Sequence, residues 1–578
     1  MLKILILLIV VTTITCYHGH HHDMDHGHSH HPQANGDPNV VQTPSGKIAG
    51  STNFKTRLGK QIYAFRGIRY AESPTGNRRF QPPEPVKSWG EEVLNATEEG
   101  PACPQPIRIP PEEFGWRTSE DCLRLNVYTT ELPNQKSKSN KLRPVVIFFH
   151  AGGFYGVSGI SNMHGPQYLL DQDVVLVTVN YRLATLGFIS TGDENAPGNL
   201  GLKDQVVAMR WVKKNIRGFG GNPDEVTIMG YSAGSMSVAL HLVSPMSKGL
   251  FHRGISMSAA PTSTYTFTNQ LDLAKKQAEL LNCPSDTSKQ IIDCLKTKDA
   301  EEISTTFFSF QEIGQDPTLI WSPVIEPDHS GEKFLTEDPA KLFNEGRFMK
   351  VPFMAGVCEH EFAGGAYRVV ANETLRNIWN NNFDYAAPIA FVYERNTTKS
   401  LAISKALKDF YIGNQEIRLE TIDGLAKLYA DGVVGWGVHR LANLVAKSND
   451  FPVYYYKFAY KGRYSHFYSP FTNKTIGASH HDELMYLFYI SVNYLNFPFF
   501  EPSDPETAMV EKMTTLWSNF IKTGNPTPEK QSITNNVIWE PLTAKQKNYM
   551  NIDSTLSMRK NLFADRYALW ESLFPISK

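Results

Sequence analysis

The chain has 578 residues, which exceeds a typical single domain but lies within reach of one large α/β domain. Hydrophobic residues make up 41%, and 57 Lys and Arg residues against 58 Asp and Glu residues give a net charge of −1. No long basic run and no solenoid-type repeat is present, so the sequence argues against nucleic-acid binding and against a repeat protein.

The first 16 residues have the pattern of a secretory signal peptide. Lys3 precedes an apolar run over residues 4–11, and small polar residues follow as far as Cys16. The run has the length of a signal-peptide core but is too short to span a bilayer. Because no second long apolar run follows, we predict a secreted, extracellular protein without a stable membrane anchor. A buried helix or strand is the alternative.

Histidine dominates residues 17–38. Such a polar tract cannot build a core, so we predict a disordered arm, with the folded domain over residues 39–578. Closely spaced neutral imidazoles can bind divalent zinc, copper or nickel, so the arm is a candidate metal site. The alternatives to metal binding are an incidental histidine tract and a purification tag. The candidate ligands are eight of the 18 histidines: His18, His20, His21, His22, His26, His28, His30 and His31.

Short apolar runs alternate with helical patterns along the folded region. Residues 143–149, 174–179, 226–229 and 352–356 are typical of buried strands, and residues 199–212 of an amphipathic helix. This alternation predicts an α/β fold with a large, mostly parallel central sheet flanked by helices.

Residues 230–234, with the sequence GYSAG, lie between a predicted strand and a predicted helix. A serine on such a turn is held at the sheet edge with its hydroxyl free and a helix N-terminus behind it. Glycine on both sides allows the strand and helix to approach closely. The five residues alone fit an ordinary glycine-rich turn with a capping serine equally well.

A longer stretch around this turn is more specific. Residues 219–234 resemble the nucleophile signature of the type-B carboxylesterases, a branch of the α/β-hydrolases that includes cholinesterases. Residues 65–89 and 120–128 resemble further blocks of the family, although Arg69 replaces its usual proline. The resemblance, which is greatest to secreted insect carboxylesterases, implies an α/β-hydrolase fold with helical cap insertions and Ser232 as the nucleophile.

The resemblance also implies an oxyanion hole. Residues 150–154, HAGGF, match the family's loop after a strand, although the family more often has glycine at Ala151. The N–H groups of Gly152, Gly153 and Ala233 would stabilise the charge on the ester oxygen in the transition state. One such donor lowers the free energy of the transition state by about 3 kcal/mol.

A serine nucleophile needs a base, and the base needs an orienting carboxylate, in the chain order serine, acid, histidine. The family's acid lies five residues after the glycine that ends the strand at 352–356, which selects Glu361, with Glu359 as the alternative. The family's Gly-x-x-His loop matches residues 477–480 and selects His480 as the base, with His481 as the alternative.

Two cysteine pairs match the family's disulfides, Cys103–Cys122 and Cys283–Cys294. Each disulfide would close a short loop and add about 3 kcal/mol to the stability of the folded state. Metal ligation is the rival explanation, but no CxxC spacing supports it. Cys358 has no partner in this pairing. We expect it to be a buried, inert thiol, and a reactive thiol is the alternative. Four Asn-x-Thr motifs are glycosylation acceptors in a secreted chain, at Asn95, Asn372, Asn396 and Asn473.

Residues 319–326 resemble the block that holds the family's acyl pocket. We therefore expect Leu319 and Trp321 in the substrate pocket, together with Phe154 and Tyr231. A bulky Trp321 would favour short acyl groups such as acetate, although packing in the core explains it equally well. Tyr231 stands where cholinesterases have a carboxylate and juvenile-hormone esterases usually have glutamine, which disfavours both assignments.

These patterns together predict a serine carboxylesterase that needs no cofactor. It would hydrolyse small esters through an acyl-enzyme intermediate, with odorant, pheromone, dietary or xenobiotic esters as the expected substrates. The alternatives are a slow scavenger that binds esters or toxins, and a cholinesterase-like adhesion module.

Overall fold

The computed structural model describes residues 39–106, 115, 117–133, 141–264, 267, 270–493 and 495–576. The predicted signal peptide, residues 1–16, and the predicted histidine-rich arm, residues 17–38, lie outside these ranges. The eight histidines of the candidate metal site therefore lie outside them as well.

An eleven-stranded sheet forms the centre of the domain, in the order β14-β13-β12-β11-β10-β9-β7-β8-β6-β4-β3. The strands from β13 to β8 in this order are all parallel to one another. They are β13 (Asn548–Ile552), β12 (Val453–Phe458), β11 (Phe353–Cys358), β10 (Arg253–Met257), β9 (Gly221–Tyr231), β7 (Arg143–Phe149) and β8 (Val175–Val179). The predicted mostly parallel sheet is thus confirmed.

Antiparallel strands flank this parallel centre. On one side they are β6 (Arg124–Thr129), β4 (Gln61–Arg69) and β3 (Ser51–Lys55), and on the other β14 (Ser557–Lys560). A separate three-stranded sheet contains β1 (Val40–Thr43), β2 (Gly46–Ala49) and β5 (Val93–Asn95).

Both faces of the central sheet are buried, which explains the continuous apolar runs in its strands. Along β7, Val145, Ile147 and Phe149 belong to the core on one face, whereas Val146 and Phe148 belong to the core on the other. Helices α3 (Leu200–Asn215), α4 (Ala233–Val243) and α14 (Trp436–Ser448) pack in the first core, and α15 (Thr507–Thr523) packs in the second.

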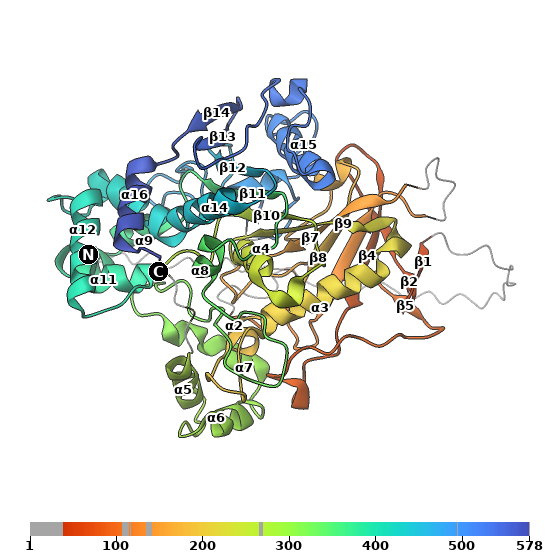
Figure 1. Cartoon of the computed structure of the whole chain (residues 1–578), viewed down its shortest axis with the longest axis horizontal. Helices are drawn as coiled ribbons and strands as arrows, with labels where there is room; N and C mark the ends of the chain where they lie inside the picture. The colour runs from red at the N-terminus through yellow and green to blue at the C-terminus, as the bar shows by residue number, and fades with distance from the viewer. Residues whose placement is uncertain are drawn as a thin grey trace, which may run out of the picture. The chain divides into compact units, whose positions relative to one another are not determined.

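Two helical insertions interrupt the alternation of strands and helices. Between β10 and β11 lie α5 (Leu271–Leu280), α6 (Ser288–Leu295), α7 (Ala300–Thr305) and α8 (Pro339–Asn344). Between β11 and β12, five helices precede α14: α9 (Gly364–Ala371), α10 (Glu373–Asn381), α11 (Phe383–Phe391), α12 (Thr398–Tyr411) and α13 (Ile422–Ala430). In Figure 1, α5, α6 and α7 group together below the sheet, while α11 and α12 lie at its left with the C-terminal helix α16 (Ala564–Leu573).

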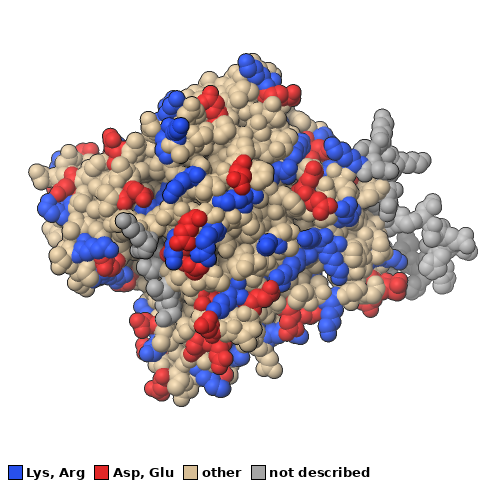
Figure 2. Space-filling model, viewed as in Figure 1, with Lys and Arg blue, Asp and Glu red and all other residues tan. Residues whose placement is uncertain are grey.

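Charged side chains of both signs are interspersed over the face seen in Figure 2, as expected from the balanced composition. Among the described residues, no helix has the length and apolarity required to cross a bilayer. The same residues contain no group of three or more His, Cys, Asp or Glu side chains that could hold a metal ion.

Candidate active site

Ser232 occupies the turn between β9 and α4. Its φ of 54° and ψ of −118° form a backbone conformation that residues with a side chain seldom adopt. The Ser232 N–H donates to the Met257 carbonyl at 2.8 Å, and the Ser232 carbonyl accepts from the Met236 N–H at 3.0 Å. These two bonds hold the turn between the end of β10 and the first turn of α4.

The glycines on either side of Ser232 are needed for steric reasons. A Cβ atom on Gly230 would lie 2.1 Å from the Gly234 carbonyl oxygen, and one on Gly234 would lie 2.0 Å from the Phe149 carbonyl oxygen. Both distances are far below van der Waals contact. The GYSAG sequence is therefore required by the close approach of α4 to β9 and to the end of β7.

His480 lies between Ser232 and Glu361. Its Nε2 is 3.1 Å from Ser232 Oγ, and its Nδ1 is 2.5 Å from Glu361 Oε2. Because an ionised carboxylate only accepts hydrogen bonds, Nδ1 carries the proton and Nε2 is free to accept the Ser232 proton. Glu361 is only 1% exposed, and its second oxygen accepts from the Cys358 N–H at 2.8 Å.

Direct bonds hold the acid loop and the histidine loop together. The His360 N–H, next to Glu361, donates to the Ala478 carbonyl at 2.9 Å. Within the histidine loop, the Asp482 carboxylate accepts from the Ser479 N–H at 2.8 Å and from the Ser465 hydroxyl at 2.7 Å. These contacts fix the distance between Glu361 and the imidazole that it orients.

The two alternative residues bond elsewhere. The Glu359 carboxylate pairs with Lys457 on β12 and lies 3.8 Å from His360 Nε2. The His481 N–H donates to the Tyr231 hydroxyl at 2.7 Å, and burial lowers the pKa of its imidazole well below 6.5. The structure thus brings together Ser232, Glu361 and His480.

Comparison with known proteins identifies the family of this chain. A family model described as the carboxylesterase family matches residues 37–570. This chain belongs to the carboxylesterase family. It is 37% identical to Esterase FE4 of Myzus persicae over 515 residues, which cover 87% of this chain and 86% of that protein. It is 34% identical to the juvenile hormone esterase of Tribolium castaneum over 561 residues, which cover 92% and 93% of the two chains.

A solved structure supports the same assignment. The crystal structure of juvenile hormone esterase from Manduca sexta, with OTFP covalently attached, matches with a TM-score of 0.80 and 29% sequence identity. The match covers 92% of this chain and 99% of that one. The fold is therefore that of the α/β-hydrolase esterases, and family membership supports carboxylic ester hydrolysis.

The loop after β7 carries the candidate oxyanion donors. Gly152 and Gly153 have φ values of 106° and 55°, which only glycine adopts readily, and both line the same cavity as Ser232 and Ala233. Among the described residues, no backbone hydrogen bond outside helices and strands uses the N–H groups of Gly152 or Gly153. The N–H of Ala233 is the first of α4 and has no partner within that helix. All three donors are thus available to a ligand.

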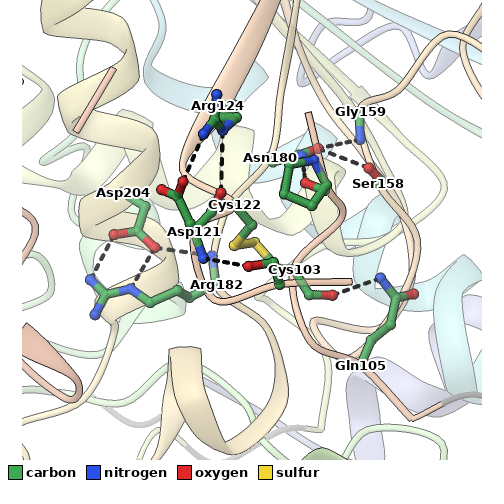
Figure 3. Close-up of a disulfide and its surroundings, with 12 residues drawn as sticks. Cys103, Gln105, Asp121, Cys122, Arg124, Ser158, Gly159, Asn180, Arg182 and Asp204 are labelled. Carbon is green, nitrogen blue, oxygen red and sulfur yellow. Dashed lines mark hydrogen bonds and ion pairs between the residues drawn. A yellow bond between two sulfur atoms is a disulfide. The ribbon is translucent and has the colours of Figure 1, made fainter. Parts of the chain in front are cut away.

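Both expected disulfides are present, and the first lies close to a residue that holds the oxyanion loop. Cys103 and Cys122 have a Cα–Cα distance of 5.0 Å, and Cys283 and Cys294 one of 5.7 Å. In Figure 3 the Cys103–Cys122 bond lies near Asn180, whose side-chain oxygen accepts from the Ser158 hydroxyl at 2.9 Å and the Gly159 N–H at 2.8 Å. Asn180 directly follows β8, so the loop is tied to the sheet.

A cavity of about 250 Å³ opens beside Ser232. Its lining includes Leu319, one of the four expected pocket residues, but the structure places the other three elsewhere. Trp321 packs against Phe310 with 5.5 Å between ring centroids, and Phe154 packs against Phe188 at 4.8 Å.

Tyr231 lies behind His480 and outside the cavity lining. It is fully buried, and its hydroxyl lies 3.4 Å from His480 Nδ1. The hydrophobic effect holds the aromatic side chains of Phe154, Tyr231 and Trp321 in the protein interior. Resemblance to a family's sequence block does not specify which way such side chains face.

Several lining residues were not identified from the sequence. They come mainly from the segment after β11, from the segment after β12 and from the π-helix before α14: His360, Phe362, Arg368, His466, Phe467, Val433 and Val434. The proximity of His360, Phe362 and Arg368 to Glu361 in sequence is the signal that could have indicated the first three.

Cys358 is a buried free thiol at the end of β11. Burial raises the pKa of this thiol well above its ordinary value, with a further contribution from Glu483. Its sulfur lies 3.8 Å from the Tyr231 hydroxyl. A buried thiol that remains protonated is a poor nucleophile, so the structure favours the inert alternative.

Proposed function

We propose that this chain is a secreted serine carboxylesterase that acts through a Ser232–His480–Glu361 triad and an acyl-enzyme intermediate. The observation that carries the proposal is the position of the His480 ring, whose two nitrogens lie 3.1 Å from Ser232 Oγ and 2.5 Å from Glu361 Oε2. An imidazole held in this way removes the serine proton and returns it to the leaving group.

In the first half of the reaction, Ser232 Oγ attacks the ester carbonyl while His480 Nε2 takes its proton. The carbonyl oxygen becomes negative and accepts hydrogen bonds from the N–H groups of Gly152, Gly153 and Ala233. His480 then protonates the departing alcohol. In the second half, water activated by His480 attacks the acyl-enzyme and releases the acid. Glu361 stabilises the imidazolium in both halves.

Short acyl esters are the substrates that we propose, among odorant, pheromone, dietary or xenobiotic esters. Trp321 does not support this preference, because its side chain is buried against Phe310. The remaining support is the cavity of about 250 Å³, which is small for a ligand pocket, since such pockets usually range from about 300 to 1,000 Å³.

Secretion and glycosylation belong to the same proposal. Disulfides persist in oxidising compartments, and the part of the chain that the structure describes contains two. The four acceptor asparagines, Asn95, Asn372, Asn396 and Asn473, are all exposed. Expression of the full chain in insect cells, with enzyme activity and N-glycosidase-sensitive mass measured in the medium, tests both points.

The decisive experiment measures hydrolysis of p-nitrophenyl acetate, butyrate, hexanoate and decanoate by wild type and Ser232→Ala. We expect sustained turnover with the short esters, loss of at least about 10³-fold in the variant, and fluorophosphonate labelling at Ser232. A burst without further turnover would indicate a scavenger, and no hydrolysis or labelling would favour an adhesion module. Faster cleavage of decanoate than of acetate would overturn the short-acyl preference.

A further inference from the structure

A second cavity adjoins the catalytic one. It has a volume of about 450 Å³, against about 250 Å³ for the cavity beside Ser232. Gly365, Arg368 and Phe467 line both cavities and therefore form their common wall. A substrate whose ester carbonyl lies at Ser232 can thus extend toward this wall.

Arg368 is the one charged side chain in this wall. It lies on α9, which begins three residues after Glu361, and Gly364 lies one turn earlier on the same face of the helix. Both residues line the catalytic cavity. A Cβ atom on Gly364 would lie 2.7 Å from the Phe467 ring, so the ring packs directly on the helix backbone next to the arginine.

The guanidinium of Arg368 is available for a ligand. The side chain is half-buried, and among the described residues it takes part in no hydrogen bond or ion pair. The carboxylate that faces it from the second cavity is Asp316, which accepts a hydrogen bond from the Tyr429 hydroxyl at 2.7 Å instead. Burial raises the pKa of Asp316, and the positive charge of Arg368 opposes this shift, so the two side chains interact through space without a hydrogen bond between them.

The charges that line the catalytic cavity also favour an anionic ligand. Within the described part of the chain, the lining contains Arg368 and four histidines, His360, His466, His480 and His481, but neither Asp nor Glu. An arginine side chain remains charged at every physiological pH. The cavity therefore offers a permanent cation and no carboxylate that would attract a cationic substrate.

We propose that Arg368 binds a carboxylate carried by the ester substrate, so that the enzyme selects anionic esters over neutral and cationic ones. The substrate class is a monoester of a dicarboxylic acid or an acyl ester of a hydroxy acid. This inference rests on the proposed esterase function of Ser232. A guanidinium matches a carboxylate with two parallel hydrogen bonds, and their loss from a partly buried site weakens binding about 10- to 100-fold.

The test compares esters that differ only in the carboxylate. For the acyl side, monomethyl adipate is compared with methyl hexanoate, and monomethyl succinate and glutarate vary the reach. For the alcohol side, 4-acetoxybenzoate is compared with 4-acetoxybenzamide, and acetylcholine serves as the cationic ester. The proteins are wild type, Arg368→Gln, Arg368→Lys and Arg217→Gln, the last of which removes an exposed arginine paired with Asp224 and absent from the lining of both cavities.

We expect wild type to prefer the anionic ester in at least one of the two pairs. Arg368→Gln should lower kcat/KM for that ester about 10- to 100-fold, mainly through KM, and change the neutral ester less than threefold. The kcat/KM of Arg368→Lys for the anionic ester should lie between those of wild type and Arg368→Gln. The kcat/KM values of Arg217→Gln should match those of wild type for both esters. Equal losses for anionic and neutral esters in Arg368→Gln, or no loss for either, would overturn the inference.

The outcomes separate this inference from the esterase proposal. Wild type that cleaves neutral esters without any preference for the anionic ones refutes the role of Arg368 and leaves the esterase function standing. Wild type that cleaves no ester refutes both. If Arg368→Gln does not fold, inhibition of wild type decides: adipate should compete with methyl hexanoate at least 10-fold more strongly than adipamide, and equal inhibition contradicts the inference.

Discussion

Gln105 and Val157 exchange two hydrogen bonds. The Val157 N–H donates to Gln105 Oε1 at 2.8 Å, and Gln105 Nε2 donates to the Val157 carbonyl at 3.1 Å. Gln105 follows the disulfide-bonded Cys103 by two residues, and its Nε2 also donates to the Cys103 carbonyl at 3.0 Å. Val157 has a φ of 72°, an unfavourable value for a β-branched residue. The Gln105 side chain thus holds the strained backbone of the oxyanion loop at Val157.

We predict that Gln105→Ala lowers kcat about 10-fold or more with little change in KM. Without the amide, the strained backbone at Val157 relaxes and the N–H groups of Gly152 and Gly153 lose their alignment with the oxyanion. Gln105→Glu retains the acceptor for the Val157 N–H but loses the donor, so its kcat should be intermediate. Steady-state kinetics with p-nitrophenyl butyrate provides the measurement, and wild-type kcat in Gln105→Ala would disprove the positioning role.

The two glutamates after β11 provide a matched pair of variants. Glu361→Gln should reduce kcat about 10³- to 10⁴-fold, because an amide in place of the carboxylate neither fixes the His480 tautomer nor stabilises the imidazolium. Glu359→Gln should stay within about threefold of wild type in activity but lose about 1–3 kcal/mol of stability, because the amide removes the negative charge that pairs with the buried Lys457. If the larger loss of kcat occurs in Glu359→Gln, the assignment of the acid is wrong.

Buried histidines predict a loss of stability in acid. Burial lowers the pKa of His241 and His164 to about 3 and that of His150 to about 4, below the value of about 6.5 in the unfolded chain. Between those values the unfolded state binds more protons, so stability is fully present above pH 6.5 and falls as the pH decreases. Each histidine should lower the free energy of unfolding by about 1–2 kcal/mol between pH 6.5 and pH 5.

A variant isolates the contribution of one of these groups. His241 lies 2.7 Å from the Ser247 hydroxyl through Nδ1 and 2.9 Å from Gln205 Oε1 through Nε2. His241→Gln should be less stable than wild type at pH 7, yet its stability should decline less steeply toward pH 5. Urea unfolding of both proteins at pH 5, 6 and 7 measures the slopes, and identical slopes would show that His241 does not titrate as expected.

Glu483 should have the opposite pH dependence. Burial, assisted by the nearby charge of Glu361, raises the pKa of Glu483 to about 8. The folded state therefore holds a proton that the unfolded state has lost above about pH 4.5, and the resulting stability disappears as the pH rises through 8. Glu483→Gln has no proton to lose, so between pH 6 and pH 9 its thermal midpoint should fall less than that of wild type. A parallel decline in both proteins would refute the raised pKa.

The sequence by itself determined the local structure around the nucleophile. The apolar run of β9, the turn at Ser232 and the start of α4 follow from neighbouring residues, because Gly230 and Gly234 alone permit the contacts that the turn requires. The strands β7, β8 and β11 were also predictable, since burial on both sheet faces demands continuous apolar runs. Family resemblance then supplied the candidates Glu361 and His480.

Only the tertiary structure decided how side chains from distant segments face one another. Glu359 and Glu361 are indistinguishable as types, yet the path of the chain after β11 directs one toward Lys457 and the other toward His480. The same applies to the pocket, where Trp321 turns into the core while Arg368 lines the cavity. The directions of the two glutamates depend on packing against segments 98 and 119 residues away in the sequence, which no local pattern encodes.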